Sequence, residues 1–266
     1  MEEIKSILNP DKRYARIVTE IRKKFDELSY YERSRVFDDF LTCAICTFHN
    51  TNLRYRLLAC DIENEKKYLE VIKHYKPKEQ LIIKEILHLF IAAVEAKNYS
   101  DPLGEYYEEY FANSRLGQFF TPMEVCRIMA EMVINEESEY KTVVDDTGCG
   151  SGRNLLAAAE VNPKNFFKAR DISITVAKLC TLNCFMNGLR GEVAWGDAIT
   201  LETWKVWEVN MMGFGIREIP IEESFYFGQE KQALESFRRR KEKEKEKLNE
   251  KIQKQSNKTD LQFKLF

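Results

Sequence analysis

Three short apolar stretches in the second half of the chain each end in an aspartate. They are VVDD, FFKARD and GEVAWGD, and their last residues are Asp146, Asp171 and Asp197. If the stretches are parallel strands, their carboxyl ends lie at one edge of a sheet. Carboxylates accept hydrogen bonds from hydroxyl groups and attract amines, whereas three of them together repel a pyrophosphate. These residues therefore indicate a site for a positively charged ligand that carries hydroxyl groups and an amine.

A glycine-rich turn follows the first of these stretches. Gly148, Gly150 and Gly152 separate it from a helical pattern rich in leucine and alanine. Such a turn lets the backbone approach a ligand closely, although glycine turns between strand and helix also occur without one. Asp171 strengthens the interpretation, because nucleotide-binding folds place an acid about twenty residues beyond the turn, where it accepts hydrogen bonds from ribose hydroxyls.

The elements that would position these residues divide the chain into three parts. Residues 1–115 show one helical pattern after another and predict an all-helical N-terminal domain. Residues 116–228 alternate short strands with helical stretches, which predicts an α/β domain. Residues 229–266 alternate charges with few apolar side chains, which predicts a charged helix or tail.

The charged tail allows two interpretations. Its composition cannot bury a core, so it is a solubilising segment, or its excess of basic residues contacts nucleic acid. The segment RYRLLAC at residues 54–60 is a second candidate for phosphate contact. The net charge of the whole chain is -2, so any affinity for DNA must come from local patches such as these.

Cysteine spacing raises the question of a metal site. Cys43, Cys46 and His49 lie close together, with Cys60 downstream. The apolar residues around them recur at helical spacing, and cysteine is often buried without a metal, whereas zinc ligands normally converge from loops. We therefore expect buried thiols and no metal site.

The remaining cysteines and the N-terminal sequence bear on the cellular compartment of the protein. Cys180 and Cys184 are four residues apart on another helical pattern, and we interpret them as buried too. The first residues show neither a basic region followed by an apolar run nor the length of apolar sequence that a membrane span needs. The expectation is a cytoplasmic protein with reduced thiols and no membrane contact.

Four segments together resemble a known family. They are GQFFTPMEVCRIMAEMV, VVDDTGCGSGRNLLAAAEV, ARDIS and GEVAWGDAIT, within a region from Asp101 to Thr200. They are similar to the adenine-N6 DNA methylases that include the modification subunits of type I restriction systems. The resemblance implies a Rossmann-like methyltransferase core that uses S-adenosylmethionine and acts on DNA. The residues after Thr200 are too few for both the full sheet and a target-recognition domain, so a shortened sheet and a partner subunit that supplies specificity are expected.

The resemblance also implies roles for individual residues. The GQFFTP segment would close over the cofactor, and this explains why a glycine, two aromatics and a proline interrupt the helical pattern there. The cofactor-binding residues that it implies are Phe120, Thr121 and Pro122 in the lid, Asp146 and the backbone of Gly148 and Gly150 at the methionine part, Asp171 at the ribose and Asp197 at the adenine amine, together with Gly152 and Ile172.

The chain departs from the family pattern at two places. Thr147 stands where the family usually has proline, a change that keeps the acid and the glycines. The catalytic Asn-Pro-Pro-aromatic motif is absent. In VNMMGFG, Asn210 and Phe214 occupy the places of the asparagine and the aromatic, so they are the catalytic candidates. VNPKNFF also contains Asn-Pro, but it precedes the second strand and is better explained as a helix-ending turn.

Three functions are compatible with these residues. The resemblance favours an adenine-N6 DNA methyltransferase that works with a partner. The second is a relative that binds S-adenosylmethionine without transferring methyl groups and serves as a regulatory or assembly subunit. The third is a structural protein that keeps the fold without the ligand. Methyl transfer distinguishes the first from the second, and cofactor binding distinguishes the second from the third.

Overall fold

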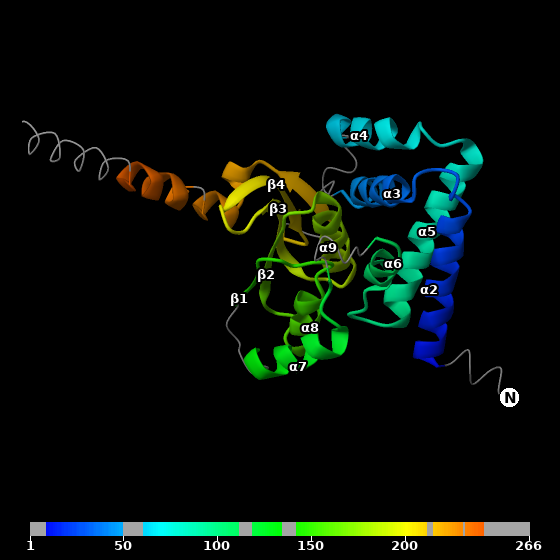
Figure 1. Cartoon of the computed structure of the whole chain (residues 1–266), viewed down its shortest axis with the longest axis horizontal. Coiled ribbons are helices and arrows are strands. Elements are labelled where there is room, and N and C mark those ends of the chain that lie inside the picture. Colours follow the sequence, from blue (N-terminus) through cyan, green and yellow to red (C-terminus); the bar gives the residue numbers. More distant parts are fainter. Residues whose placement is uncertain are drawn as a thin grey trace, which may run out of the picture.

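The computed structural model describes residues 9–49, 61–111, 119–134, 142–211, 215–230 and 232–241, and it has a mixed α/β architecture (Figure 1). The elements described before residue 111 are helices, apart from an isolated bridge at His49. These helices are α2 (Pro10–Asp26), α3 (Arg33–Thr47), α4 (Ile62–Ile72), α5 (Pro77–Ala96) and α6 (Pro102–Tyr110). A further helix, α7 (Met123–Val133), follows before the sheet begins.

The N-terminal helices begin where the sequence provides capping side chains. The Asn9 side chain accepts hydrogen bonds from the first turn of α2, and Asp61 does the same for α4.

Aromatic side chains join α2, α3 and α6. The Phe25 ring stacks on the Tyr106 ring with the ring centres 4.4 Å apart, and the centres of the Phe25 and Phe37 rings are 5.7 Å apart. Burial of these large rings contributes to the stability of this part of the chain.

A five-stranded sheet follows in the order β1-β2-β3-β4-β5. Its strands are β1 (Val143–Asp146), β2 (Phe166–Asp171), β3 (Arg190–Asp197), β4 (Glu202–Val209) and β5 (Ile216–Ile219). The first three are parallel, and α8 (Arg153–Val161) and α9 (Ile174–Met186) connect them, whereas β4 and β5 continue as antiparallel strands. The predicted α/β class is therefore confirmed, while the Rossmann-like assignment stays a prediction.

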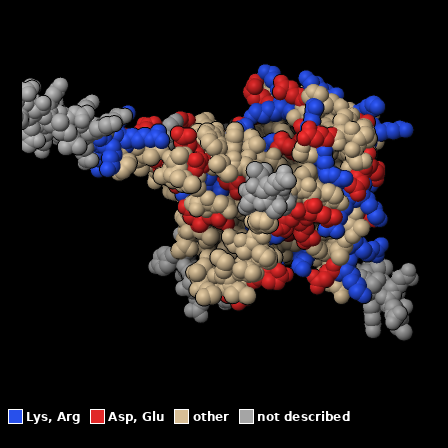
Figure 2. Space-filling model, in the orientation of Figure 1, with Lys and Arg blue, Asp and Glu red and all other residues tan. Residues whose placement is uncertain are grey.

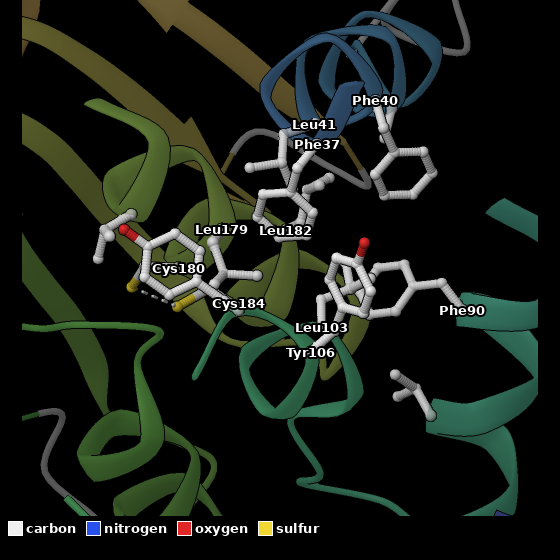
Figure 3. Packing of buried hydrophobic residues seen from close by; sticks show 14 of the residues in the cluster. Phe37, Phe40, Leu41, Phe90, Leu103, Tyr106, Leu179, Cys180, Leu182 and Cys184 are labelled. Atoms are coloured by element: carbon white, nitrogen blue, oxygen red, sulfur yellow. Dashed lines mark hydrogen bonds between the residues drawn. The ribbon is translucent and has the colours of Figure 1, made fainter. Parts of the chain in front are cut away.

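One continuous hydrophobic core joins the N-terminal helices to the sheet. Helix α9 lies at its centre, packed against α3 on one side and against β2 and β3 on the other. Figure 3 shows Phe37 and Leu41 of α3 beside Leu182 of α9, with Leu103 and Tyr106 of α6 close by. The predicted boundary between residues 115 and 116 falls outside the described residues, so the domain division stays a prediction.

The cysteines of the described helices belong to this core. Cys43, Cys46, Cys180 and Cys184 are buried free thiols. Burial raises the pKa of Cys43 to about 12 and that of Cys46 to about 11, so both are uncharged thiols near neutral pH. His49 pairs with Asp61 at 2.9 Å, and the described residues contain no group of three His, Cys, Asp or Glu side chains placed to hold a metal. Cys60 lies outside the described residues, as does the RYRLLAC segment.

The sheet face opposite α8 and α9 carries a buried charged cluster. Lys168 and Arg170 of β2 point to this face and are almost fully buried. Glu230, from the helical segment after β5, accepts hydrogen bonds from both, with the Arg170 Nη2 at 2.5 Å from its carboxylate. The C-terminal segment is therefore fastened to the sheet as far as residue 230. Residues 232–241 are helical, and no described helix is long and apolar enough to cross a membrane.

Replacing Glu230 by alanine is expected to lower the free energy of unfolding by about 2 kcal/mol, because two buried cations lose a hydrogen-bonded carboxylate. Urea denaturation measures this change. The matched control is Glu63→Ala, which removes an exposed pair with Lys66 and should change stability by less than about 0.5 kcal/mol. Equal effects of the two substitutions would contradict the importance of the buried cluster.

Candidate cofactor site

The turn between β1 and α8 has a backbone that requires glycine at two positions. Gly150 has φ +53°, and a Cβ there would lie 2.8 Å from the Phe120 ring. Gly152 has φ +92°, and a Cβ there would lie 2.9 Å from the Cys180 sulfur. Gly148 differs from both, since a Cβ on it would meet nothing within 4 Å. The turn is thus packed on its inner side and open at Gly148, which leaves its backbone accessible to a ligand.

Asp171 and Asp146 lie on either side of this turn. The Gly150 N–H donates to the Asp171 carboxylate at 3.1 Å, and the Ser173 N–H donates to it at 2.8 Å. Burial raises the pKa of Asp171 above its ordinary value, and these two backbone bonds oppose that shift. Asp146 accepts from the Gly148 N–H at 3.4 Å and from the Asn154 side chain at 3.1 Å. The two carboxylates therefore belong to one site.

Asn154 has an oxygen that is not used within the described protein. Its amide nitrogen donates to Asp146, while its buried Oδ1 has no hydrogen-bond partner. An amide oxygen beside a carboxylate can accept a hydrogen bond from an amine. Sequence reasoning did not select Asn154 as a ligand-binding residue. The sequence offered one indication of this role: Asn154 lies in the first turn of α8, directly after the glycine-rich turn.

Asp197 lies at the end of β3, on the same edge of the sheet. Its carboxylate accepts from the backbone N–H groups of Ile199 and Thr200, at 2.7 and 3.3 Å, and these bonds lower its pKa. Ile172, directly after β2, leaves 63% of its surface exposed, and its carbonyl oxygen accepts from the Trp195 indole at 3.0 Å. The ionised Asp197 carboxylate at the end of β3 and the exposed Ile172 side chain after β2 thus lie at the same end of the strands as Asp171.

The described part of the GQFFTP segment lies against the glycine turn. Phe120 stacks on Tyr107 with the ring centres 5.4 Å apart, and its ring is the atom group nearest to Gly150. The Thr121 carbonyl accepts from the Arg153 guanidinium at 3.4 Å, and Pro122 is the capping residue of α7. The structure therefore places the Phe120 ring against the turn and the Thr121 carbonyl against α8, and the role of Phe120, Thr121 and Pro122 as a lid stays a prediction. Residues 116–118 lie outside the described residues.

Asp101 stabilises the glycine turn through buried hydrogen bonds, a role that the sequence did not predict. Its buried carboxylate accepts from Arg153 Nε at 2.7 Å, Ser151 Oγ at 2.5 Å and Asn183 Nδ2 at 2.7 Å. It also caps α6 through the Gly104 N–H at 2.9 Å. Burial raises the pKa of Asp101, and the Arg153 charge acts against that shift. One side chain thereby connects a helix of the N-terminal part to the turn, α8 and α9.

The catalytic candidates do not join this site. Because β4 runs antiparallel to β3, Asn210 at its end lies at the edge of the sheet opposite Asp197. Its side-chain amide donates to the carbonyls of Phe185 and Leu189, at 3.2 and 2.9 Å, and so ties the end of β4 to the segment between α9 and β3. Its backbone N–H donates to the Gly215 carbonyl at 2.9 Å, which closes the turn after β4. Phe214 lies outside the described residues. The geometry therefore gives Asn210 a structural task and separates it from the aspartates.

The assembled residues suit an organic cation with polar groups. Asp146 and Asn154 Oδ1 offer acceptors to an amine, Asp171 offers a partly buried carboxylate to hydroxyl groups, and Asp197 offers a partly exposed carboxylate to a second amine. Gly148 is open to a ligand on its side-chain side, since a Cβ there would have no neighbour within 4 Å. S-adenosylmethionine has the amine, the hydroxyl groups and the sulfonium charge that this set of acceptors fits.

The similarity to known proteins agrees with this chemistry. Residues 98–263, more than half of the chain, match the sequence model of the family described as N-6 DNA Methylase. The chain is similar to the Type I restriction enzyme MpnII methylase subunit of Mycoplasma pneumoniae, with 27% identity over 128 residues. That match covers 43% of this chain and only 23% of the curated relative, so the chain spans about a quarter of that relative's length.

A solved structure is also similar. It is the crystal structure of the type I restriction-modification system methyltransferase subunit from Streptococcus thermophilus. The identity is 14% and the TM-score 0.36, with 66% of this chain and 56% of that chain covered.

Proposed function

Because the chain belongs to the N-6 DNA methylase family, we propose that its site binds S-adenosylmethionine and that the protein takes part in methylating N6 of adenine in DNA. The family is generally dependent on this cofactor. The observation that carries the proposal is the open glycine turn with a carboxylate at the end of each neighbouring strand. When bound, the cofactor would supply a methyl group activated by a sulfonium charge.

Each residue has a proposed role. Asp146 and Asn154 hold the amine of the methionine part, and the Gly148 backbone lies against that part of the molecule. Asp171 accepts hydrogen bonds from the ribose hydroxyls, Ile172 contacts the adenine ring, and Asp197 accepts from the adenine amine. Phe120, Thr121 and Pro122 cover the ligand from the lid side and exclude water.

The target amine requires a hydrogen-bond acceptor beside the methyl group. Among the described side chains at the site, the acceptors discussed above are the three carboxylates and the Asn154 Oδ1, which are all assigned to the cofactor, and Asn210 lies at the opposite end of the strands. We therefore propose that a partner subunit contributes to DNA recognition and to the transfer step. The similar protein from Mycoplasma pneumoniae is itself named a subunit.

The second candidate function is a cofactor-binding subunit without methyl transfer. The observation that favours it is the engagement of the Asn210 amide with two backbone carbonyls. A radiolabelled methyl-transfer assay on unmethylated DNA, with and without partner subunits, separates the two functions. Incorporation of label into adenine supports the methyltransferase, whereas cofactor binding without incorporation in either condition supports the second function.

Calorimetric titration with S-adenosylmethionine is the first experiment. Saturable binding is expected, and Asp146→Ala should weaken it at least about tenfold, which corresponds to about 1.4 kcal/mol. Asp145→Ala is the matched control, because this neighbouring carboxylate pairs with Lys168 at 2.7 Å and not with the turn. A folded wild-type protein that binds no cofactor, alone or with partner subunits, would exclude the proposed function.

The affinity for S-adenosylmethionine should depend on pH through Asp171. Its hydroxyl-binding form is the ionised carboxylate, and its pKa is raised by burial. As the pH falls through that raised pKa, protonation removes an acceptor, so the affinity declines at a higher pH than an ordinary aspartate would produce. Titrations across a pH series measure this. In Asp171→Asn the decline should disappear, whereas Asp197→Asn, which removes a carboxylate of lowered pKa, should keep it.

A further inference from the structure

The helical segment of residues 232–241 carries a run of cations that has no role in the proposed cofactor site. Residues 238–241 have the sequence RRRK, and all four are exposed. Within the described chain, the ion pair that this run makes is the one between Arg238 and Glu202, at 3.6 Å. Figure 1 shows the segment as the orange helix that extends from the sheet beside β3 and β4, and Figure 2 shows Lys and Arg side chains gathered on it. We refer to residues 232–241 as the basic helix.

The basic helix begins at the end of the sheet that carries the cofactor site. Leu234 and Arg238 line a small pocket of about 260 Å³ together with Trp204, near the start of β4. Because β4 is antiparallel to β3, the start of β4 lies beside Asp197 at the end of β3. A substrate that receives a methyl group must approach this end of the strands. The cations of the basic helix therefore lie on the side from which DNA would arrive.

Trp204 is an exposed aromatic residue that connects the cofactor site to the basic helix. It leaves 43% of its surface exposed, and its ring centre lies 5.0 Å from that of Trp195. Trp195 in turn donates its indole N–H to the Ile172 carbonyl at 3.0 Å. Trp204 also lines a cleft of about 730 Å³ between α4, α9 and β4. An exposed indole beside such a cleft is a surface on which a planar base can stack.

The charges on the two sides of Trp204 separate a place for a base from a place for phosphates. The described lining of the cleft has more carboxylates than lysines, and its Lys67 and Lys205 both pair with Glu218. Phosphate groups are therefore repelled from the cleft, whereas an uncharged base is not. The basic helix begins beyond the small pocket that Trp204 shares with Arg238, and its four cations attract phosphates.

We propose that the basic helix and Trp204 together bind one strand of DNA, with its phosphates against residues 238–241 and an unpaired base stacked on Trp204. This inference rests on the proposed function, because DNA is the substrate named in the description of the chain's family. Electrostatic contact with the backbone and stacking of bases on aromatic rings hold single strands without sequence preference. The contact is therefore independent of base sequence, and a partner subunit remains the source of specificity.

The first test measures the affinity of the full chain for a fluorescein-labelled single-stranded DNA oligonucleotide by fluorescence anisotropy. A matched oligonucleotide of the same length and charge has abasic sites in place of its central bases. Both should bind saturably, and the abasic one at least about fivefold more weakly, because stacking on the indole is lost. In Trp204→Leu the two should bind equally, whereas Trp204→Phe should preserve the difference. Equal binding of the two by the wild type, or an undiminished difference in Trp204→Leu, would overturn the proposal.

Salt dependence tests the basic helix. The test variant changes three of its cations to glutamine: Arg239→Gln, Arg240→Gln and Lys241→Gln. The control variant removes the same charge from exposed side chains of α2: Lys12→Gln, Arg13→Gln and Arg16→Gln. In the test variant the plot of log affinity against log salt should become less steep by about 2, since each phosphate contact to a single strand contributes about 0.7. The control should keep the slope of the wild type. Equal slopes in the two variants would contradict a DNA contact at the basic helix.

An acidic protein is the other occupant that a run of cations could attract. Polyglutamate with the same net charge as the oligonucleotide is therefore added as a competitor, and it should displace the oligonucleotide only at a much higher concentration. Displacement at an equal concentration would assign the surface to an acidic protein and overturn the proposal. The anisotropy titrations contain no S-adenosylmethionine. Failure of this inference therefore appears in the anisotropy, and failure of the proposed cofactor site appears in the calorimetry.

Discussion

Replacing Asp101 by alanine is expected to lower the free energy of unfolding by about 3–5 kcal/mol, a large part of the roughly 5–15 kcal/mol that stabilises a typical protein. The carboxylate is 4% exposed and accepts from Arg153, Ser151 and Asn183. Without it, the buried Arg153 guanidinium loses the more deeply buried of its two carboxylate partners, and the side chains of Ser151 and Asn183 lose an acceptor. Urea denaturation measures the loss.

Glu108→Ala is the matched control for this prediction. Glu108 also pairs with Arg153, at 2.6 Å, but its side chain is 32% exposed. We expect it to cost about 1 kcal/mol or less, because water replaces much of what the pair provides. If both substitutions cost the same, the buried network is not what fastens α6 to the turn. Asp101→Asn should fall between them, since its amide keeps one acceptor.

The largest expected effect on cofactor binding comes from Gly148→Val. The native backbone accepts a side chain at this position without a clash, because a Cβ placed on Gly148 would have no neighbour within 4 Å and its φ is not in the left-handed region. Stability should therefore change by less than about 0.5 kcal/mol. The side chain would fill the space proposed for the cofactor, so affinity should fall at least about a hundredfold, or about 2.7 kcal/mol.

Two other glycines provide controls for this substitution. Gly188→Ala, in the turn before β3, introduces a side chain at φ +73° and should reduce stability while the affinity for cofactor is unchanged. Gly150→Ala should reduce both, because the added Cβ displaces Phe120. Thermal denaturation and calorimetry on the same samples distinguish these outcomes. Normal cofactor affinity in Gly148→Val would place the ligand elsewhere.

Local sequence predicted the parts of the site that local chemistry determines. A strand that ends in an acid, a turn of spaced glycines and a following helix are all contained in residues 143–161, and the structure has them as predicted. The strands ending at Asp171 and Asp197 were predictable for the same reason, because their apolar pattern and their acids are adjacent in the sequence. The parallel order then brings the three acids to one edge.

Long-range and directional features were not predictable. The segment WKVWEV at residues 204–209 has the alternating apolar pattern of a strand and lies in β4. The pattern does not tell whether that strand runs parallel or antiparallel to β3, and the direction decides where Asn210 lies. The Asp101 side chain contacts Arg153 across 52 positions of sequence. An aspartate before a proline indicates a helix cap. Nothing in that local pattern indicates contacts with α8 and α9.

The Asp101 carboxylate ties the glycine turn to α6, because it accepts from Ser151 in the turn and from the Gly104 N–H at the start of α6. Opening of α6 would therefore remove a contact that holds the turn. If opening of α6 reduces the affinity for S-adenosylmethionine by some factor, thermodynamic reciprocity requires the bound cofactor to reduce the opening of α6 by the same factor. The protection of α6 amides against hydrogen exchange would then report on cofactor binding at the turn.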